Sequence, residues 1–419
     1  MPSMAERAGI AYSTTAPADA VAKLQHQIDD GSVTLDFDAQ HGYLPAVLRA
    51  LNVPVSSQGL VFSKTSLQLD RIAPWTPRAV YFNDDVYVGW VQNGPIMEVA
   101  TADPKLGAVF YTLNQQQTEH PVFERQSRTC LVCHDSASVT GGVPGFIMRS
   151  IYADRYGYAI PNAREGITTD STPLAERWGG WYVSGRVGDQ RHMGNVIAPV
   201  TAHEISNVAS YESKVDLSAK ANLTDLSGLF NTKPYLSPHS DAVALMVLAH
   251  QTHIHNLITL AGYEARSGSP EQQVLGAADR LAKALLFARE AELTAPVEGT
   301  SVFAKEFVGQ GPRDHQGRSL RDLDLERRLF RYPLSYMIYT ESFDALPSVV
   351  KDRVYARVKA VLTGTDTSGD YGDPSPEERK AVLEILNDTK PDFAAVVGHA
   401  TNAGGHAGPP VETTPQTSR

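Results

Sequence analysis

Short apolar runs alternate with turn residues between positions 79 and 113 of the chain. The runs are rich in β-branched and aromatic residues and cover positions 79–82, 86–91, 96–100 and 108–113. Asn, Asp, Gly and Pro gather in the breaks between them, as in Asn93-Gly94-Pro95. This pattern predicts an antiparallel meander of about four strands. A further strand is expected over 145–152, and 177–185 is expected to form a hairpin with 191–196.

The apolar period changes to that of helices from Pro238 onward. A long helix is predicted over 241–265, with Ser237 or Ser240 as its N-cap. Shorter helices are expected at 18–28, 43–51, 270–293, 347–362 and 376–387. The fold class is therefore predicted as α+β, with a β-rich N-terminal half and a mostly helical C-terminal half. The expected division is an arm at 1–40, a β-rich domain at 41–235, a helical domain at 236–397 and a disordered tail at 398–419.

Composition narrows the class of protein. The chain has 419 residues, of which 42% are hydrophobic, and a formal net charge of −10. No basic run is present, so nucleic acid is not expected as a partner. No apolar run reaches the roughly 18 residues of a membrane-spanning helix, so no transmembrane segment is expected. The sequence does not indicate an oligomeric state.

The most specific motif is Cys130-Leu131-Val132-Cys133-His134, which contains both cysteines of the chain. At this spacing two thiols can add to the vinyl groups of a haem, and the histidine can bind the iron. We expect one covalently attached haem c, with His134 as proximal ligand. A thiol redox pair or a partial zinc site are the alternatives, but no second cysteine pair is present to complete a zinc site.

A second set of residues could act on the other side of the iron. Met193 lies 59 residues after His134 and is a candidate sixth ligand, and its neighbour His192 is another. On the long predicted helix, His250 and His253 share an apolar stripe, where a metal-ligand or acid–base role competes with simple core packing.

Arginines near the motif are candidate partners for haem propionates, because guanidinium groups suit carboxylates. We expect Arg177 and Arg191 to contact the propionates. The alternative for each of them is an ordinary solvated arginine on the surface. Trp178 and Trp181 could pack on a macrocycle, and ordinary aromatic core packing explains them equally well.

Several segments together resemble a family. PRAVYFNDDVYVGWV, FERQSRTCLVCH, GVPGF, ERWGGWYVSG and HMGN, within positions 77–195, resemble bacterial mono-haem cytochrome c domain proteins of unassigned activity. The resemblance extends over most of positions 43–392. It implies a periplasmic or secreted haem c protein, and it carries over only Cys130, Cys133 and His134 as attachment and proximal-ligand residues.

Three functions follow as hypotheses. The first is an oxidoreductase that acts on a small oxidant at an open iron site, with His250 or His253 as acid–base group. The second is a six-coordinate electron-transfer cytochrome, and either of these would need a redox partner protein. The third is a zinc- or thiol-based structural protein. Haem c is attached outside the cytoplasm, yet the first residues contain no apolar signal region, so we expect that a leader precedes this sequence.

Overall fold

The computed structural model describes residues 3–7, 9–199, 201, 204, 208, 212 and 215–394. Its centre is a seven-stranded antiparallel sheet with the strand order β6-β5-β4-β3-β2-β1-β9. The strands are β1 (Gly59–Val61), β2 (Arg78–Phe82), β3 (Val86–Trp90), β4 (Ile96–Asp103), β5 (Gly107–Asn114), β6 (Phe123–Arg125) and β9 (Trp181–Tyr182). Consecutive pairing of β2 to β5 confirms the predicted meander.

The two faces of this sheet are covered by different parts of the chain. One face packs against the N-terminal helices α1 (Ala20–Asp29) and α2 (Leu44–Ala50) in one hydrophobic cluster. The other face shares a second cluster with the C-terminal helices, through side chains such as Phe82, Tyr87 and Phe110. This second cluster therefore contains residues from both of the predicted halves, and the α+β class is confirmed.

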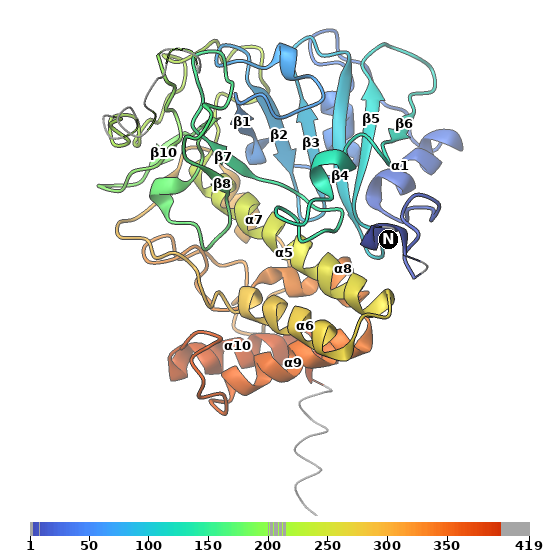
Figure 1. The fold of residues 1–419 in the computed structure, drawn as a ribbon, viewed down its shortest axis with the longest axis vertical. Helices are drawn as coiled ribbons and strands as arrows, with labels where there is room; N and C mark the ends of the chain where they lie inside the picture. The colour runs from blue at the N-terminus through green and yellow to red at the C-terminus, as the bar shows by residue number, and fades with distance from the viewer. Residues whose placement is uncertain are drawn as a thin grey trace, which may run out of the picture.

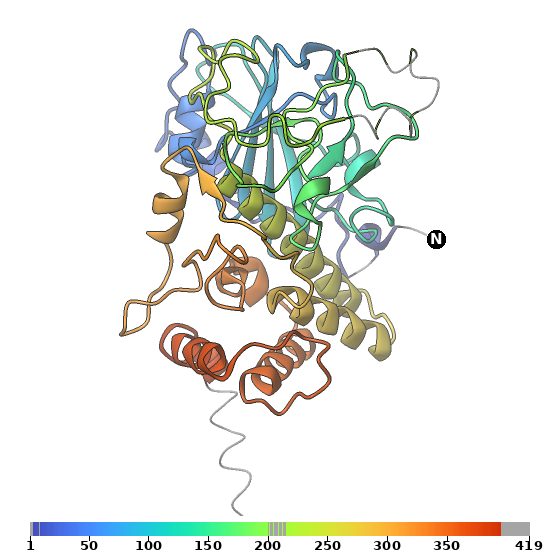
Figure 2. The same cartoon turned by 90° about the vertical axis from the view of Figure 1, so that its left-hand side faces the viewer.

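Helix α5 (Ala242–Arg266) is the central helix of the molecule. It lies between the sheet and the layer of helices formed by the last part of the chain (Figures 1 and 2), and most of its residues are buried. A helix that is apolar on nearly all sides needs such a buried position. Its N-cap is Asp241, whose carboxylate accepts from the backbone N–H groups of Val243 and Ala244. The predicted caps, Ser237 and Ser240, are therefore wrong, because the helix begins after the carboxylate that satisfies its free N–H groups.

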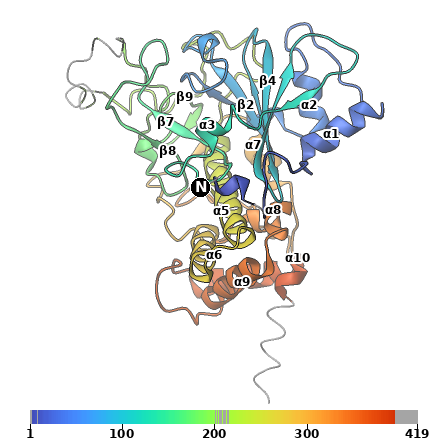
Figure 3. The ribbon, with the colours of Figure 1, turned by 45° about the vertical axis from the view of Figure 1, so that its right-hand side comes forward.

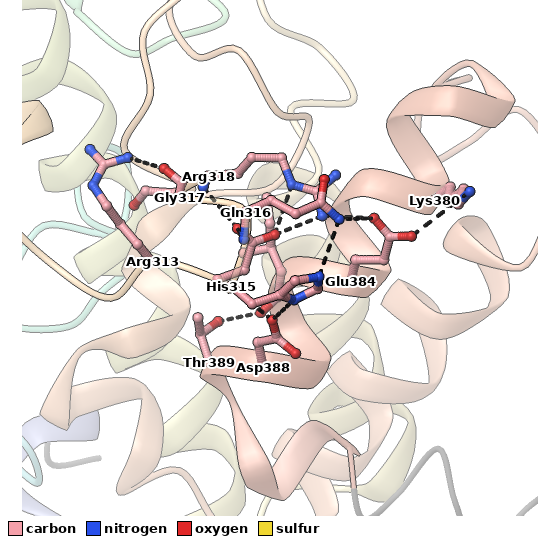
Figure 4. A network of polar contacts seen from close by, with 12 residues as sticks. Arg313, His315, Gln316, Gly317, Arg318, Lys380, Glu384, Asp388 and Thr389 are labelled. Carbon is pink, nitrogen blue, oxygen red and sulfur yellow. Dashed lines mark hydrogen bonds and ion pairs between the residues drawn. The ribbon is translucent and has the colours of Figure 1, made fainter.

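The other C-terminal helices are α6 (Glu271–Leu285), α7 (Phe303–Val308), α8 (Glu341–Asp344), α9 (Ser348–Leu362) and α10 (Pro376–Thr389). Helices α6, α9 and α10 form a layer beyond α5 (Figure 1), whereas α7 lies beside the sheet, where Phe303 packs against Phe82 of β2. Helix α6 ends eight residues earlier than predicted, at Leu285 rather than at position 293. A polar network ties α10 to the loop at 313–318 (Figure 4): Arg318 contacts Glu384 at 2.7 Å, and His315 contacts Asp388 at 2.5 Å.

The predicted hairpin between 177–185 and 191–196 is wrong. Strand β9 instead pairs with β1, and β10 (Gly185–Arg186) pairs with β11 (Glu298–Gly299). The strand expected over 145–152 is shorter, as β7 (Arg149–Ile151), and pairs with β8 (Glu165–Ile167). Before β9 the chain turns sharply, with Trp178 at a φ of 69° and fully buried. Positive φ is rare for a bulky residue. The backbone N–H groups of Met193 and Asn195 donate to the carbonyl oxygens of Arg177 and Trp181, so the two segments touch although 191–196 forms no strand.

Among the described residues, no helix is both long and apolar enough to cross a bilayer. The predicted tail at 398–419 lies outside the described residues.

Candidate functional site

The Cys-x-x-Cys-His motif forms a short surface helix, α3 (Leu131–His134), with Cys130 directly before it. Figure 3 shows α3 in front of the main sheet, with β7 and β8 beside it. Cys130 is half-buried and Cys133 is exposed, and both are free thiols. Val132 between them is 82% exposed. The motif therefore presents two thiols and an apolar side chain toward the outside.

The ring of His134 is held in one orientation. Its Nδ1 lies 2.8 Å from the carbonyl oxygen of Gly145, and its ring packs against Phe110 with centroids 4.6 Å apart. A carbonyl oxygen can only accept, so Nδ1 carries the proton and donates it, and Nε2 keeps its lone pair. Burial lowers the pKa of His134, which favours the neutral ring that metal ligation requires.

Asn256 on α5 holds the peptide that orients His134. Its Oδ1 accepts from the backbone N–H of Phe146 at 2.8 Å, and its Nδ2 donates to the Phe146 carbonyl at 2.8 Å. A Cβ at Gly145 would lie 2.5 Å from Asn256 Oδ1, so only glycine allows this close approach.

The sheet face beside the motif is open at one end. Along β2 and β4, alternate residues are half-buried (Arg78, Val80, Glu98 and Ala100), whereas their neighbours on the other face are buried. Arg78 and Glu98 form an ion pair of 2.8 Å on this face. Both charges reach the motif, because they contribute to the pKa shift of His134 after the dominant effect of burial. The motif therefore lies against a partly uncovered face with small apolar residues and one arginine.

The thiol of Cys130 is poorly suited to redox exchange. Burial, followed by the charge of Glu98, raises the pKa of Cys130 to about 11. A thiol of that pKa is almost entirely protonated at neutral pH and is a weak nucleophile. No group of three or more His, Cys, Asp or Glu side chains in the described part of the chain is arranged to hold a metal ion. A closed structural zinc site needs four such ligands, and the zinc alternative stays a prediction.

Asp170 joins the two predicted histidines of α5. Its carboxylate lies 2.9 Å from His253 Nδ1 and 3.5 Å from His250 Nδ1. Burial alone raises the pKa of Asp170, but hydrogen bonds and charges from the two histidines outweigh it and hold the pKa well below its usual range. Asp170 is thus ionised at neutral pH. Its backbone carbonyl accepts from Arg177 Nη2 at 2.7 Å, which fixes the loop that carries the carboxylate.

The two histidines have different surroundings. His250 is fully buried; its Nε2 lies 2.7 Å from Ser335 Oγ, and its ring packs against Phe287. Ser335 is also fully buried, so this Ser-His-Asp arrangement offers no path for a substrate. His253 lines a cavity of about 180 Å³ between α5 and the loop that follows the motif. The sequence predicted both histidines on an apolar face of the helix. In the structure only His253 reaches a cavity, whereas the ring of His250 is enclosed in the core.

Other predicted site residues lie apart from α3. Met193 is buried in a small cluster with Tyr152 and Ile160, and its sulfur lies 3.8 Å from Ser150 Oγ. His192 is fully buried, and its Nε2 lies 3.1 Å from the Ala221 carbonyl oxygen. Burial lowers the pKa of His192 to about 4.

The two selected arginines also differ. Arg177 is buried and donates to the carbonyl oxygens of Thr172 and Asp170. Arg191 is exposed, and its charge contributes to lowering the pKa of Asp216. The predicted contacts of Arg177 and Arg191 with haem propionates stay predictions.

Sequence reasoning missed Asp170, Asn256 and Thr168. Asp170 and Thr168 belong to the polar stretch 168–173, which reads as an ordinary loop. Asn256 follows His253 by three positions, which places both on one side of α5. That spacing was the only local signal, and nothing in the sequence indicates that Asn256 bonds to Phe146.

A buried carboxyl near this cluster predicts a pH effect. Burial raises the pKa of Glu290 from 4.5 to about 7. Its contribution to stability is complete below the unfolded pKa, near 4.5, and is lost as the pH rises through 7. Glu290→Gln keeps the oxygen that accepts from Leu329 N and removes the ionisation. We therefore expect the variant to gain thermal stability over the wild type at pH 8 and to gain little at pH 5.

Thermal unfolding followed by circular dichroism at both pH values measures this difference. Glu119→Gln, at an exposed position, is the control and should change neither value. An equal effect of Glu290→Gln at pH 5 and pH 8 would contradict the proposed ionisation.

Comparison with protein-family models, with curated proteins and with solved structures found no match. The resemblance to cytochrome c domain proteins therefore stays a prediction.

Proposed function

We propose that this protein carries one covalently attached haem c and works as a redox protein outside the cytoplasm. Cys130 and Cys133 would form the thioether bonds, and His134 would bind the iron through Nε2. The observation that carries the proposal is the orientation of His134: Nδ1 donates to the Gly145 carbonyl at 2.8 Å, and Nε2 keeps its lone pair. Histidines that ligate metals typically make such a bond from the other ring nitrogen.

The surroundings of the motif fit a haem group. Val80 and Ala100 offer small apolar side chains on the half-buried sheet face. Arg78 on the same face is paired with Glu98 at 2.8 Å, so it would bind a propionate only in exchange for that carboxylate. The exposed Val132 lies between the two thiols, and a bound macrocycle would explain an apolar residue in that position. The haem supplies one-electron chemistry at its iron, tuned by the axial ligand and by burial. The chain supplies attachment, orientation and surface for a redox partner.

An open iron site is favoured over a six-coordinate carrier. His192 and His250 are fully buried, and Nε2 of each is hydrogen-bonded to another group, whereas, among the described residues, Nδ1 of His192 has no hydrogen-bond partner and Nδ1 of His250 has only its 3.5 Å contact with Asp170. Met193 belongs to a separate cluster. An oxidoreductase that acts on a small oxidant is therefore the function we prefer, with an electron-transfer cytochrome as the alternative. The cavity of His253 is lined by Phe146, next to the carbonyl that Nδ1 of His134 contacts. This cavity therefore lies beside the Gly145–Phe146 peptide, and the distal role of His253 stays a prediction.

The direct test is a pyridine haemochrome assay on the protein expressed with a haem c maturation system and an export leader. We expect the spectrum of a haem with two thioether bonds, at one haem per chain, and its loss in the Cys130→Ala/Cys133→Ala double variant. A wild-type protein that matures without covalent haem would refute the proposal. In the loaded protein, a ferric spectrum that shifts with cyanide supports the open site, whereas an inert low-spin spectrum supports the carrier.

A further inference from the structure

The cavity beside α5 has walls of two kinds. Apolar side chains from three segments line most of it, namely Val139, Phe146, Ile167, Leu257 and Leu260. The remaining lining is uncharged and polar, with four threonines, His253 and Asn256. No Lys, Arg, Asp or Glu lines this cavity among the described residues. An apolar cavity with a few converging polar groups is the usual form of a small-molecule site.

His253 provides a hydrogen-bond acceptor at this cavity. Asp170 is an ionised carboxylate and can only accept, so the ring proton shared with it lies on His253 Nδ1, 2.9 Å from Asp170. In the tautomer with one ring proton, Nε2 carries the lone pair. No polar atom of the described residues bonds to Nε2, and the side chain of His253 is 28% exposed. A buried carboxylate that orients a histidine in this way also increases the basicity of its other nitrogen.

Thr168 provides a second polar group without a partner. Its side chain is 1% exposed, and its hydroxyl forms no hydrogen bond. Buried hydroxyls are almost always hydrogen-bonded, and one that is not needs an explanation. Because Thr168 lines the same cavity as His253, a ligand there would supply the missing partner.

Size and charge together define the class of ligand. A cavity of about 150 Å³ accepts a benzene ring, and this cavity measures about 180 Å³. Apolar walls favour a ring or short chain, and the lack of charged lining residues disfavours an ion. We propose that this cavity binds a small uncharged molecule with an apolar ring and a hydroxyl group, which donates to His253 Nε2. A phenol is the simplest molecule of this class.

Isothermal titration calorimetry with phenol tests the proposal on the full chain, as purified. We expect saturable binding at one site, and a hydrogen bond of this kind predicts about tenfold weaker binding in His253→Ala. Toluene, which lacks the hydroxyl, should bind more weakly than phenol, and benzoate should not bind measurably. Leu260→Trp should abolish binding by filling the cavity. His26→Ala removes an exposed histidine and should bind phenol as the wild type does.

Because His253→Ala removes the hydrogen-bond partner of Asp170 and can disturb folding, Thr168→Val serves as an independent variant that keeps the Asp170–His253 hydrogen bond. It should weaken phenol binding without lowering thermal stability, because the hydroxyl that it removes has no partner. The proposal is overturned if wild-type protein shows no saturable phenol binding, if toluene binds as tightly as phenol, or if binding survives both Leu260→Trp and Thr168→Val unchanged. The site does not depend on the haem proposal, since the same titration on the Cys130→Ala/Cys133→Ala variant should give the same affinity.

Discussion

Replacing Asp170 with asparagine should lower the free energy of unfolding by about 1–3 kcal/mol at pH 7, the usual cost of leaving a buried hydrogen-bonding group without its partner. Asp170 is 5% exposed and faces His250 and His253 with its two carboxylate oxygens. Asparagine has nearly the same shape, but it offers only one accepting oxygen. One histidine N–H would lose its partner inside the core. The negative charge of residue 170, which lies near Arg177, would also be lost.

The pH dependence of this effect follows from the sign of the pKa shift. Because the folded-state pKa of Asp170 is depressed, its stabilisation is fully present above the unfolded pKa of about 3.9. It is lost as the pH falls below that value toward the folded pKa. The gap between wild type and Asp170→Asn should therefore narrow from pH 4 to pH 3.

Urea unfolding, followed by circular dichroism at several pH values, measures both quantities. Asp189→Asn changes an exposed aspartate and should stay within about 0.5 kcal/mol of the wild type. A loss below about 1 kcal/mol in Asp170→Asn at pH 7 would show that the two histidines do not depend on its charge.

The second large effect is expected at His134. In haem-loaded protein, His134→Ala should leave the haem attached through Cys130 and Cys133, and should change the ferric absorption spectrum and the midpoint potential. Axial-ligand identity is a main determinant of both. The lost ring leaves space against Phe110, so added imidazole should restore the wild-type spectrum at least in part.

The pyridine haemochrome assay verifies that the variant contains covalent haem before its spectrum is compared. His26→Ala is the matched control, because His26 is exposed on α1, and it should change neither spectrum nor potential. If loaded His134→Ala keeps the wild-type ferric spectrum and potential, His134 is not the proximal ligand, even though the thioether bonds form.

Local patterns predicted much of the fold because the contacts that they describe are local. Strands β2 to β5 follow one another along the chain and pair with their neighbours, so alternation and turn residues were sufficient. The hairpin at 177–196 failed for the opposite reason. Strand β9 pairs with Val61 and Leu60 of β1, about 120 residues earlier, and no periodicity near Trp181 records that partner.

The sequence by itself determined the Cys130–His134 motif, the α+β class and the helical position of His250 and His253, because each depends on spacing within a few residues. Only the tertiary structure decided which side chains meet. It placed Asp170 against both histidines, Gly145 against His134 Nδ1, and Asn256 against Phe146. It also buried His250 while His253 kept access to a cavity. Such contacts join segments that are about 10 to 110 residues apart, and they depend on how α5 packs against the loops beside the sheet.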